Sequence, residues 1–317
     1  MPMNIAATKT IGIAVITHHA KHHLPQCLPY YLQSSLKPKV LVVNSSSNDG
    51  TVEAAQELGA ETLVIPRQEF NHGSTREKAR KHLGTDIVVM ITPDAYPADK
   101  HVLENLVAPL ITAQASVAYA RQIPHDGATF FEAFPRHFNY PEEGHVRSLL
   151  DLHLYGIYTF FCSNSCAAYL NGALDDIGGF QPVLLGEDTV AVAKLLRKGH
   201  KIAYVSEAIV KHSHRYTLLE EMRRNFDTGL ARKEYQYLLE CGYKDSKRGK
   251  EYVVRMIEQL TKKDVHLLPY AFVQTAAKWL GYRLGRLSSK APLWFKKSLS
   301  SQDFYWVSDA YLNEKKL

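Results

Sequence analysis

The 317-residue chain has no long hydrophobic segment and no export signal at its start. A helix that crosses a bilayer needs ~20 consecutive apolar residues, and no stretch of the sequence approaches that length. The segment from Met1 to Thr10 lacks the basic start and apolar stretch of a signal peptide. We therefore expect a cytoplasmic protein without membrane spans.

Cysteine is scarce, and its spacing excludes a common class of metal site. The four cysteines are Cys27, Cys162, Cys166 and Cys241, and no two of them form the Cys-x-x-Cys pair of a zinc site. Cys162 and Cys166 lie among apolar residues, which favours buried, reduced thiols. Reduced thiols agree with a reducing cytoplasm.

The composition excludes disorder and repeats but leaves the partner open. Apolar residues make up 45% of the chain and charged residues 22%, as in ordinary globular proteins. Lys and Arg number 38 against 32 Asp and Glu, a formal net charge of +6. This charge favours anionic partners without distinguishing nucleic acid, nucleotide and lipid.

Apolar runs and helical patterns alternate in the first part of the chain. Residues 11–16 form a continuous apolar, β-branched run that is typical of a buried parallel strand. Similar patterns predict strands at 40–43, 62–65 and 86–91, with helices at 24–36, 51–58 and 75–83 between them. This alternation indicates βαβ units, and so an α/β fold with a mostly parallel sheet.

Three of the predicted strands run into polar residues, at Thr17, Asn44 and Asp94. Right-handed crossovers bring such loops to one edge of the sheet, where open α/β sheets bind ligands. The loop after the second strand, with Ser46 and Asp49, either caps the next helix or binds a ligand. Its position after a strand favours the ligand.

Asp94 is the strongest acidic candidate in the first half. Oxygen ligands hold the divalent cation that neutralises a nucleotide diphosphate, and a carboxylate at a strand end suits that task. The alternative is an N-cap for a helix that begins near residues 99–101.

The second half adds two acids and two histidines. We predict a helix over 169–180 and another over 189–198, with Glu187 and Asp188 at the start of the latter. Acids are favoured in a first helical turn whatever the function. A strand at 202–205 comes next. The apolar residues 208–210 then lead to His212 and His214, which alternate on an extended segment. We expect only one of them to reach a metal.

Five segments together resemble a known family. They are Val42–Thr51, Glu69–Arg76, Thr92–Ala95, Gly186–Asp188 and His212–His214. In this order they resemble family 2 glycosyltransferases with the GT-A fold, whose Rossmann-like, mostly parallel sheet is flanked by helices. The Phe-Asn-His-Gly segment and the Asp-Ala after the strand look most like bacterial rhamnosyltransferases of surface-polysaccharide synthesis. The resemblance covers roughly residues 10–235.

The resemblance implies roles for individual residues, with Mg²⁺ or Mn²⁺ as cofactor. Asp188 looks like the general base, with Glu187 beside it to position the acceptor. Asp94 and His212 look like metal ligands, and His214 and Asn164 are further candidates for the site. The donor-binding candidates are Thr17, Asn44, Ser46, Asp49, His72, Arg76, Pro93 and Asp94, among which Arg76 resembles the basic group near base or phosphate.

Two positions depart from the family pattern. Asn44 stands where the family usually has Asp, which puts the nucleobase preference in doubt. Thr92 stands where the first acid of Asp-x-Asp often lies, so metal binding would depend on Asp94, His212 and the donor phosphates.

The implied function is inverting, non-processive transfer of a sugar, with L-rhamnose from dTDP-rhamnose as the first choice and a UDP-linked donor as the other. The acceptor would be lipid-linked or an oligosaccharide, in O-antigen or capsule synthesis, and no nucleic-acid partner is expected. One alternative is a sugar-phosphate nucleotidyltransferase, although the Gly-rich segment of that class is missing after the first strand. A binding homologue without turnover is the other.

The tail differs in character from the rest. We expect a catalytic domain at 1–235, with a nucleotide-sugar half at about 10–100 and an acceptor half at about 101–235, and a helical extension at 236–317. Residues 265–287 form a basic amphipathic pattern, and Pro292–Lys297 adds aromatic and basic residues. Such a helix either lies on the inner-membrane surface or packs against protein.

Overall fold

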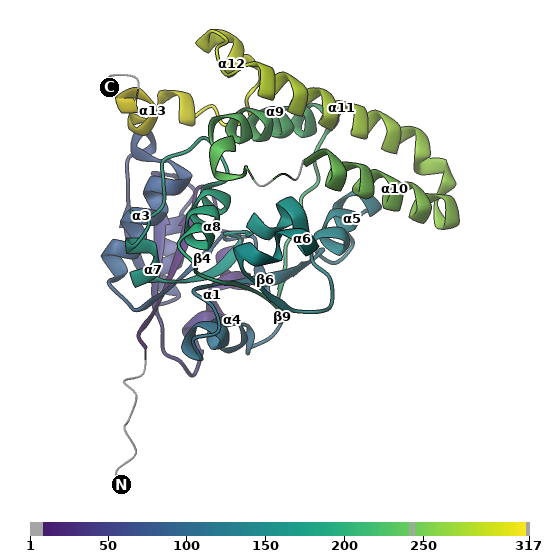
Figure 1. Ribbon diagram of the computed structural model, residues 1–317. Coiled ribbons are helices and arrows are strands. Elements are labelled where there is room, and N and C mark those ends of the chain that lie inside the picture. The colour runs from purple at the N-terminus through teal and green to yellow at the C-terminus, as the bar shows by residue number, and fades with distance from the viewer. Residues whose placement is uncertain (1–8, 241, 243–244, 315–317) are drawn as a thin grey trace.

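The computed structural model describes residues 9–240, 242 and 245–314 (Figure 1). Its centre is a nine-stranded sheet with the path β3-β2-β1-β4-β8-β6-β9-β5, and β7 pairs with β9 beside this path. The strands are β1 (Ile11–Thr17), β2 (Lys39–Asn44), β3 (Glu61–Val64), β4 (Ile87–Ile91), β5 (Tyr96–Pro97), β6 (Val117–Ile123), β7 (His145–Arg147), β8 (Cys166–Leu170) and β9 (Ile202–Lys211).

The first four strands of the chain run parallel, as the sequence predicts. β1 pairs with β2 and with β4, and β2 pairs with β3, all in parallel register. Every residue of β1 and β4 is buried. Helices cover both faces of such a sheet, which explains the continuous apolar runs.

The predicted helix over 169–180 is wrong. Cys166–Leu170 forms β8, antiparallel to β4 and β6 in the middle of the sheet, and only Asn171–Asp175 is helical, as α7. Cys166–Leu170 has no β-branched residue, so its own preference for a strand is weak. Pairing with β4 and β6 on both sides within the buried sheet makes it a strand.

The strand predicted at 202–205 is longer than expected, because β9 continues through residues 208–210. It pairs in parallel with β6, and the register shifts after Ala120, so that Arg121 faces Ile209. This irregularity lets a single long strand reach the sheet edge, where it ends just before His212.

Two hydrophobic cores lie on opposite faces of the sheet. One contains buried residues of α1, α2 and α4, and the other contains residues of α3, α8 and α9. The α-helices are α1 (Leu24–Leu32), α2 (Thr51–Glu57), α3 (His72–Leu83), α4 (Val102–Ile111), α5 (Phe130–Asn139), α6 (Leu152–Tyr155), α7 (Asn171–Asp175), α8 (Glu187–Arg197), α9 (Leu218–Glu234), α10 (Asp245–Lys263), α11 (Leu268–Leu287), α12 (Leu293–Leu299) and α13 (Asp309–Glu314).

The last helices pack against the rest of the molecule at several places. Met256 and Leu260 of α10 and Ala271 of α11 form a small core with Phe134 of α5. α11 packs along α9, and its partner α10 reaches out beside it (Figure 1). Farther on, Tyr305, Trp306 and Tyr311 join the core on the α8 face. The expected domain boundary after residue 235 stays a prediction. No helix among the described residues is long and apolar enough to cross a bilayer.

Candidate active site

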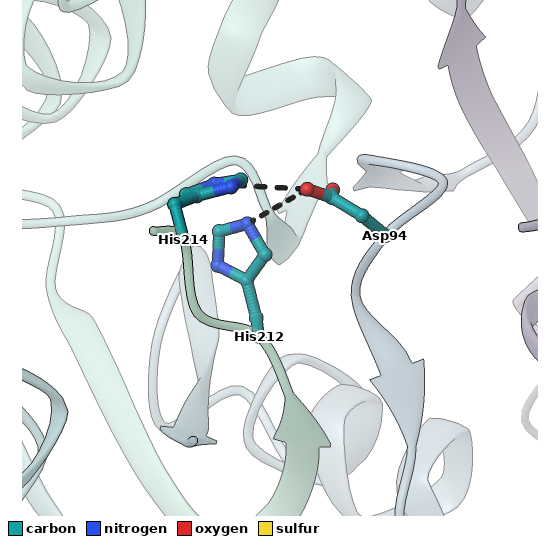
Figure 2. Close-up of side chains that lie close together, drawn as sticks. All are labelled: Asp94, His212 and His214. Carbon is teal, nitrogen blue, oxygen red and sulfur yellow. Dashed lines mark ion pairs between the residues drawn. The ribbon is translucent and has the colours of Figure 1, made fainter. Parts of the chain in front are cut away.

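Asp94, His212 and His214 form a compact cluster at the sheet edge (Figure 2). Asp94 follows β4 after Thr92 and Pro93, and the histidines follow β9. Nε2 of His212 lies 3.5 Å from Oδ2 of Asp94, and Nε2 of His214 lies 3.6 Å from the same oxygen. One ligand atom from each residue lies within 4.8 Å of the others.

The expectation that only one histidine faces the metal position is wrong. Both rings point toward Asp94 in Figure 2. Side chains alternate between faces only within a strand, and β9 ends at Lys211. His212 and His214 lie beyond that end, where the backbone no longer imposes alternation.

Gln122 fixes the tautomer of His212. Oε1 of Gln122 accepts a hydrogen bond from the Arg136 guanidinium at 2.6 Å, and Nδ1 of His212 lies 2.9 Å from the same oxygen. Because Arg only donates, this Gln atom is the oxygen, and Nδ1 of His212 must carry a proton to donate to it. In the neutral ring, Nε2 then presents a lone pair to Asp94.

This arrangement suits a divalent cation. Burial lowers the pKa of His212, and it lowers that of His214 to about 3, so both rings are neutral near pH 7. A lone pair and a carboxylate oxygen that face each other across 3.5 Å repel unless a cation or proton lies between them. Neutral imidazoles and a carboxylate are also suitable ligands for Mn²⁺. The residues therefore fit a metal held by Asp94, His212 and His214.

Glu187 and Asp188 begin α8, and their surroundings differ. Glu187 is buried and paired with Arg76, 3.1 Å away, and it accepts a hydrogen bond from the Asn164 side chain at 3.0 Å. Asp188 accepts backbone hydrogen bonds from Asn164 and Thr189. Glu187 is neutralised by a guanidinium, whereas Asp188 is held by two backbone amides and, more weakly, by the Thr189 hydroxyl at 3.4 Å.

These surroundings separate the pKa values of the two acids. Burial, followed by the charge of Glu187, raises the pKa of Asp188 to about 6. Burial opposes ionisation of Glu187 as well, but Arg76 outweighs it and lowers the pKa of that carboxyl. Asp188 can therefore take up a proton near neutral pH, as a general base does.

The short segment after Cys162 connects the acid pair with the histidine cluster. Ser163 accepts a hydrogen bond from Gln122 at 2.9 Å, and Gln122 in turn holds His212. The next residue, Asn164, holds both Glu187 and Asp188. Two adjacent residues thus fix both groups. Cys162 and Cys166 are buried and free, as predicted, whereas Cys241 lies outside the described residues.

The loop after β2 is internally bonded. The amide of Asn44 donates to Thr17 and Ser47 and accepts from the Ser47 backbone, and it is fully buried. Ser46 donates to the carbonyl of Ile65. These hydrogen bonds shape the loop, and the roles of these residues in donor binding stay predictions.

Asp49 has a structural task in the same loop. It accepts hydrogen bonds from the hydroxyls of Ser47 and Thr51 and from the backbone of Lys21. Burial would raise the pKa of Asp49, but these hydrogen bonds lower it well below its ordinary value. Asp49 thus joins the loops after β1 and β2.

The expected role of Arg76, near the base or phosphate of the donor, stays a prediction. Arg76 is buried, and its guanidinium serves Glu187 and the carbonyl of His72. Arg67, which the sequence argument missed, lies nearer the loop after β2, where it donates to Ser45 at 3.0 Å. Arg67 lies between β3 and α3, in a stretch without the hydrophobic periodicity of a helix or strand, so the sequence pattern did not single it out.

An aromatic residue from the tail covers this region. Phe304 packs against Phe70 and His72, with ring centroids 4.9 and 5.7 Å apart, and the Arg67 guanidinium stacks over it at 4.7 Å. Nδ1 of His72 lies 3.3 Å from Nη1 of Arg76. Through His72, Phe304 therefore supports the Arg76–Glu187 ion pair next to Asp188. A contact between such distant segments is invisible in local sequence patterns.

A cavity of about 780 Å³ opens beside the histidine cluster. Its lining includes His23, Asp94, Tyr96, His125, Lys211 and His214. Two of the three clustered residues are therefore accessible from this cavity.

The family follows from comparison with known proteins. The profile described as "Glycosyl transferase family 2" matches residues 13–178. The O-antigen chain rhamnosyltransferase RfbN of Salmonella typhimurium is 34% identical over 311 residues, which are 97% of this chain and 99% of that protein. The chain belongs to glycosyltransferase family 2. The O-antigen chain rhamnosyltransferase WbaN of Salmonella anatum is 34% identical to this glycosyltransferase over 90% of this chain and 91% of that protein.

Solved structures confirm the GT-A fold of the glycosyltransferase. The mannosyltransferase PcManGT from Pyrobaculum calidifontis, in complex with GDP-Man and Mn²⁺, matches with a TM-score of 0.56 at 16% identity, over 97% of this chain and 87% of that one. Residues 1–349 of S. aureus TarS match with a TM-score of 0.55 at 15% identity, over 96% of this chain and 92% of that one.

The geometry of the cluster predicts the effect of removing its members. In the presence of dTDP, Asp94→Ala and His212→Ala should each weaken Mn²⁺ binding by more than about ten-fold. Gln122→Leu should also weaken it, because His212 loses the partner that fixes its tautomer. Titration of free Mn²⁺ by electron paramagnetic resonance measures these affinities.

The matched control is His125→Ala, which removes an imidazole from the same cavity but not from the cluster. Its Mn²⁺ affinity should equal that of the wild type. Wild-type affinity in Asp94→Ala would show that the cluster does not hold the metal.

Proposed function

We propose that this glycosyltransferase moves L-rhamnose from dTDP-rhamnose to a saccharide acceptor in O-antigen or capsule-type polysaccharide synthesis. The sugar is supported by two rhamnosyltransferases that align with nearly the whole chain. The family membership argues against a sugar-phosphate nucleotidyltransferase. The single structural observation that carries the reaction is the buried acid Asp188, with a pKa of about 6, joined through Ser163 and Asn164 to the Asp94 cluster.

The transfer step places Asp188 next to the acceptor. Its carboxylate takes the proton of the acceptor hydroxyl as the acceptor oxygen attacks the anomeric carbon. The new carbon–oxygen bond forms on the face opposite the departing nucleotide diphosphate, which leaves with the electron pair of the broken bond. Attack from the opposite face inverts the anomeric configuration.

Glu187 and Arg76 tune the base in this proposal. Paired with Arg76, Glu187 stays ionised beside Asp188 and holds the pKa of Asp188 up. A base with a pKa near the working pH combines a large ionised fraction with adequate basicity.

Asp94, His212 and His214 would hold the divalent cation. The mannosyltransferase of the same fold was solved with GDP-Man and Mn²⁺, which supports a divalent cation in this protein as well. When bound, the cation neutralises negative charge on the diphosphate. The protein contributes the ligands and, through Gln122, their orientation.

Asp188→Asn tests the assignment of the base. Because Asn has nearly the same shape but cannot accept the proton, kcat should fall by about 10²–10⁴. The Kd for dTDP should not change. Transfer to the acceptor and calorimetry of dTDP binding measure the two quantities.

Asp176→Asn is the matched control, because that side chain is 62% exposed and pairs only with His200 among the described residues. It should retain wild-type kcat. Wild-type turnover in Asp188→Asn would refute the assignment of the base.

The pH dependence of the rate follows from the raised pKa of Asp188. The base works only when ionised, so kcat/KM should fall as the pH drops below about 6. Glu187→Gln removes the negative charge beside Asp188, and the positive charge of Arg76 then has no counter-ion. Both effects lower the pKa of Asp188, so the fall of kcat/KM on the acid side should move to lower pH.

Glu187→Gln also leaves Arg76 buried without its partner, which costs about 3–5 kcal/mol of stability. The profile is therefore recorded where circular dichroism shows the variant folded. The pH at which kcat/KM falls does not depend on the concentration of folded enzyme, so a partial loss of folded protein does not shift it. A fall that stays at the same pH in Glu187→Gln would contradict this account of the pKa.

A further inference from the structure

The segment from Val265 to Ser300 contains no Asp or Glu. It spans α11 and α12, and its basic residues are Lys278, Arg283, Arg286, Lys290, Lys296 and Lys297. These six charges equal the formal net charge of +6 of the whole chain. The rest of the chain is therefore balanced, and the excess positive charge is concentrated here.

One face of α11 is closely packed. A Cβ atom at Gly281 would lie 2.1 Å from the carbonyl oxygen of Met222, and one at Gly285 would lie 2.0 Å from that of Phe226. The backbone of α11 thus touches that of α9, which lies between α11 and the sheet in Figure 1. This contact fixes the rotation of α11 about its axis.

The opposite face of α11 is apolar and exposed. Phe272 is 77% exposed, Trp279 63%, Leu280 45% and Leu287 75%. Their spacing of seven, one and seven residues places them on one stripe of the helix, about half a turn from Gly281 and Gly285. Isolated exposed apolar residues are ordinary on a protein surface, but a stripe of them marks an interaction surface.

Basic groups accompany the stripe. The Arg283 guanidinium lies 6.0 Å from the ring centre of Trp279. Just beyond α11, Lys290 and Lys297 are exposed, and Trp294 on α12 is 70% exposed. Tryptophan beside arginine and lysine is the composition that suits the boundary between lipid headgroups and acyl chains.

We propose that this outer face of α11, with α12, docks on an anionic lipid bilayer. The apolar stripe would enter the headgroup boundary, and the basic residues would contact acidic headgroups. A second copy of the chain is the less suitable occupant, because two acid-free segments would bring like charges together. The inference does not depend on the proposed reaction, because binding is measured without donor or acceptor.

Co-sedimentation of the full-length protein with vesicles tests the proposal. The protein should sediment with phosphatidylglycerol vesicles and much less with pure phosphatidylcholine vesicles, and its binding to phosphatidylglycerol should weaken as salt rises. Each charge removed, as in Arg283→Gln, Lys290→Gln or Lys297→Gln, should weaken binding by about five-fold. A wild-type protein that stays in solution with phosphatidylglycerol vesicles would overturn the proposal.

The apolar stripe is tested by the triple variant Phe272→Ser, Trp279→Ser and Leu287→Ser. These side chains are exposed, so the fold should persist, and vesicle binding should fall by more than about ten-fold. The matched control is Leu150→Ser with Leu154→Ser, which removes two exposed leucines outside α11 and α12. Equal loss of binding in both variants would refute the location of the face.

Tryptophan fluorescence gives a second readout. Trp279 and Trp294 are exposed, whereas Trp306 is buried in the core. Emission should therefore shift to shorter wavelength on adding phosphatidylglycerol vesicles, and Trp279→Phe with Trp294→Phe should abolish the shift. A dimer in sedimentation velocity that disappears in the Phe272, Trp279 and Leu287 variant would instead assign the face to a second copy and overturn the proposal.

Discussion

The buried ion pair between Arg76 and Glu187 is the interaction on which the candidate site depends. A carboxylate costs several kcal/mol to bury unless a cation and hydrogen bonds compensate it, and Glu187 has both, from Arg76 and Asn164. The pair joins α3 to α8 and keeps a negative charge beside Asp188. The same interaction therefore fixes the start of α8, and the charge of Glu187 adds to burial in raising the pKa of Asp188.

The two halves of the site are held by one short segment of chain. Ser163 and Asn164 precede β8, the central antiparallel strand, and bond to Gln122 on one side and to the acid pair on the other. β8 pairs with β4, whose end leads to Asp94. The position of Asp188 relative to Asp94 and the two histidines is thus set by the sheet.

Local patterns in the sequence predicted the parts of the fold that local physics determines. Buried parallel strands have continuous apolar runs, and the β1, β2 and β4 segments were found from them. β8 was not, because it has no β-branched residue and only its pairing with β4 and β6 makes it a strand. The pairing of Arg76 with Glu187 and the packing of Phe304 on His72 join distant segments, so no periodicity reveals them.

The central claim, a metal-dependent nucleotide site at this sheet edge, is tested most directly by thermal unfolding with dTDP, UDP and GDP, each with and without Mn²⁺. Ligands that bind only the folded state raise the unfolding temperature. The account predicts a rise of about 5 °C with dTDP and Mn²⁺ at ~100 times Kd, and a much smaller rise without the metal. An unfolding temperature that no nucleotide changes, with or without Mn²⁺, would contradict it.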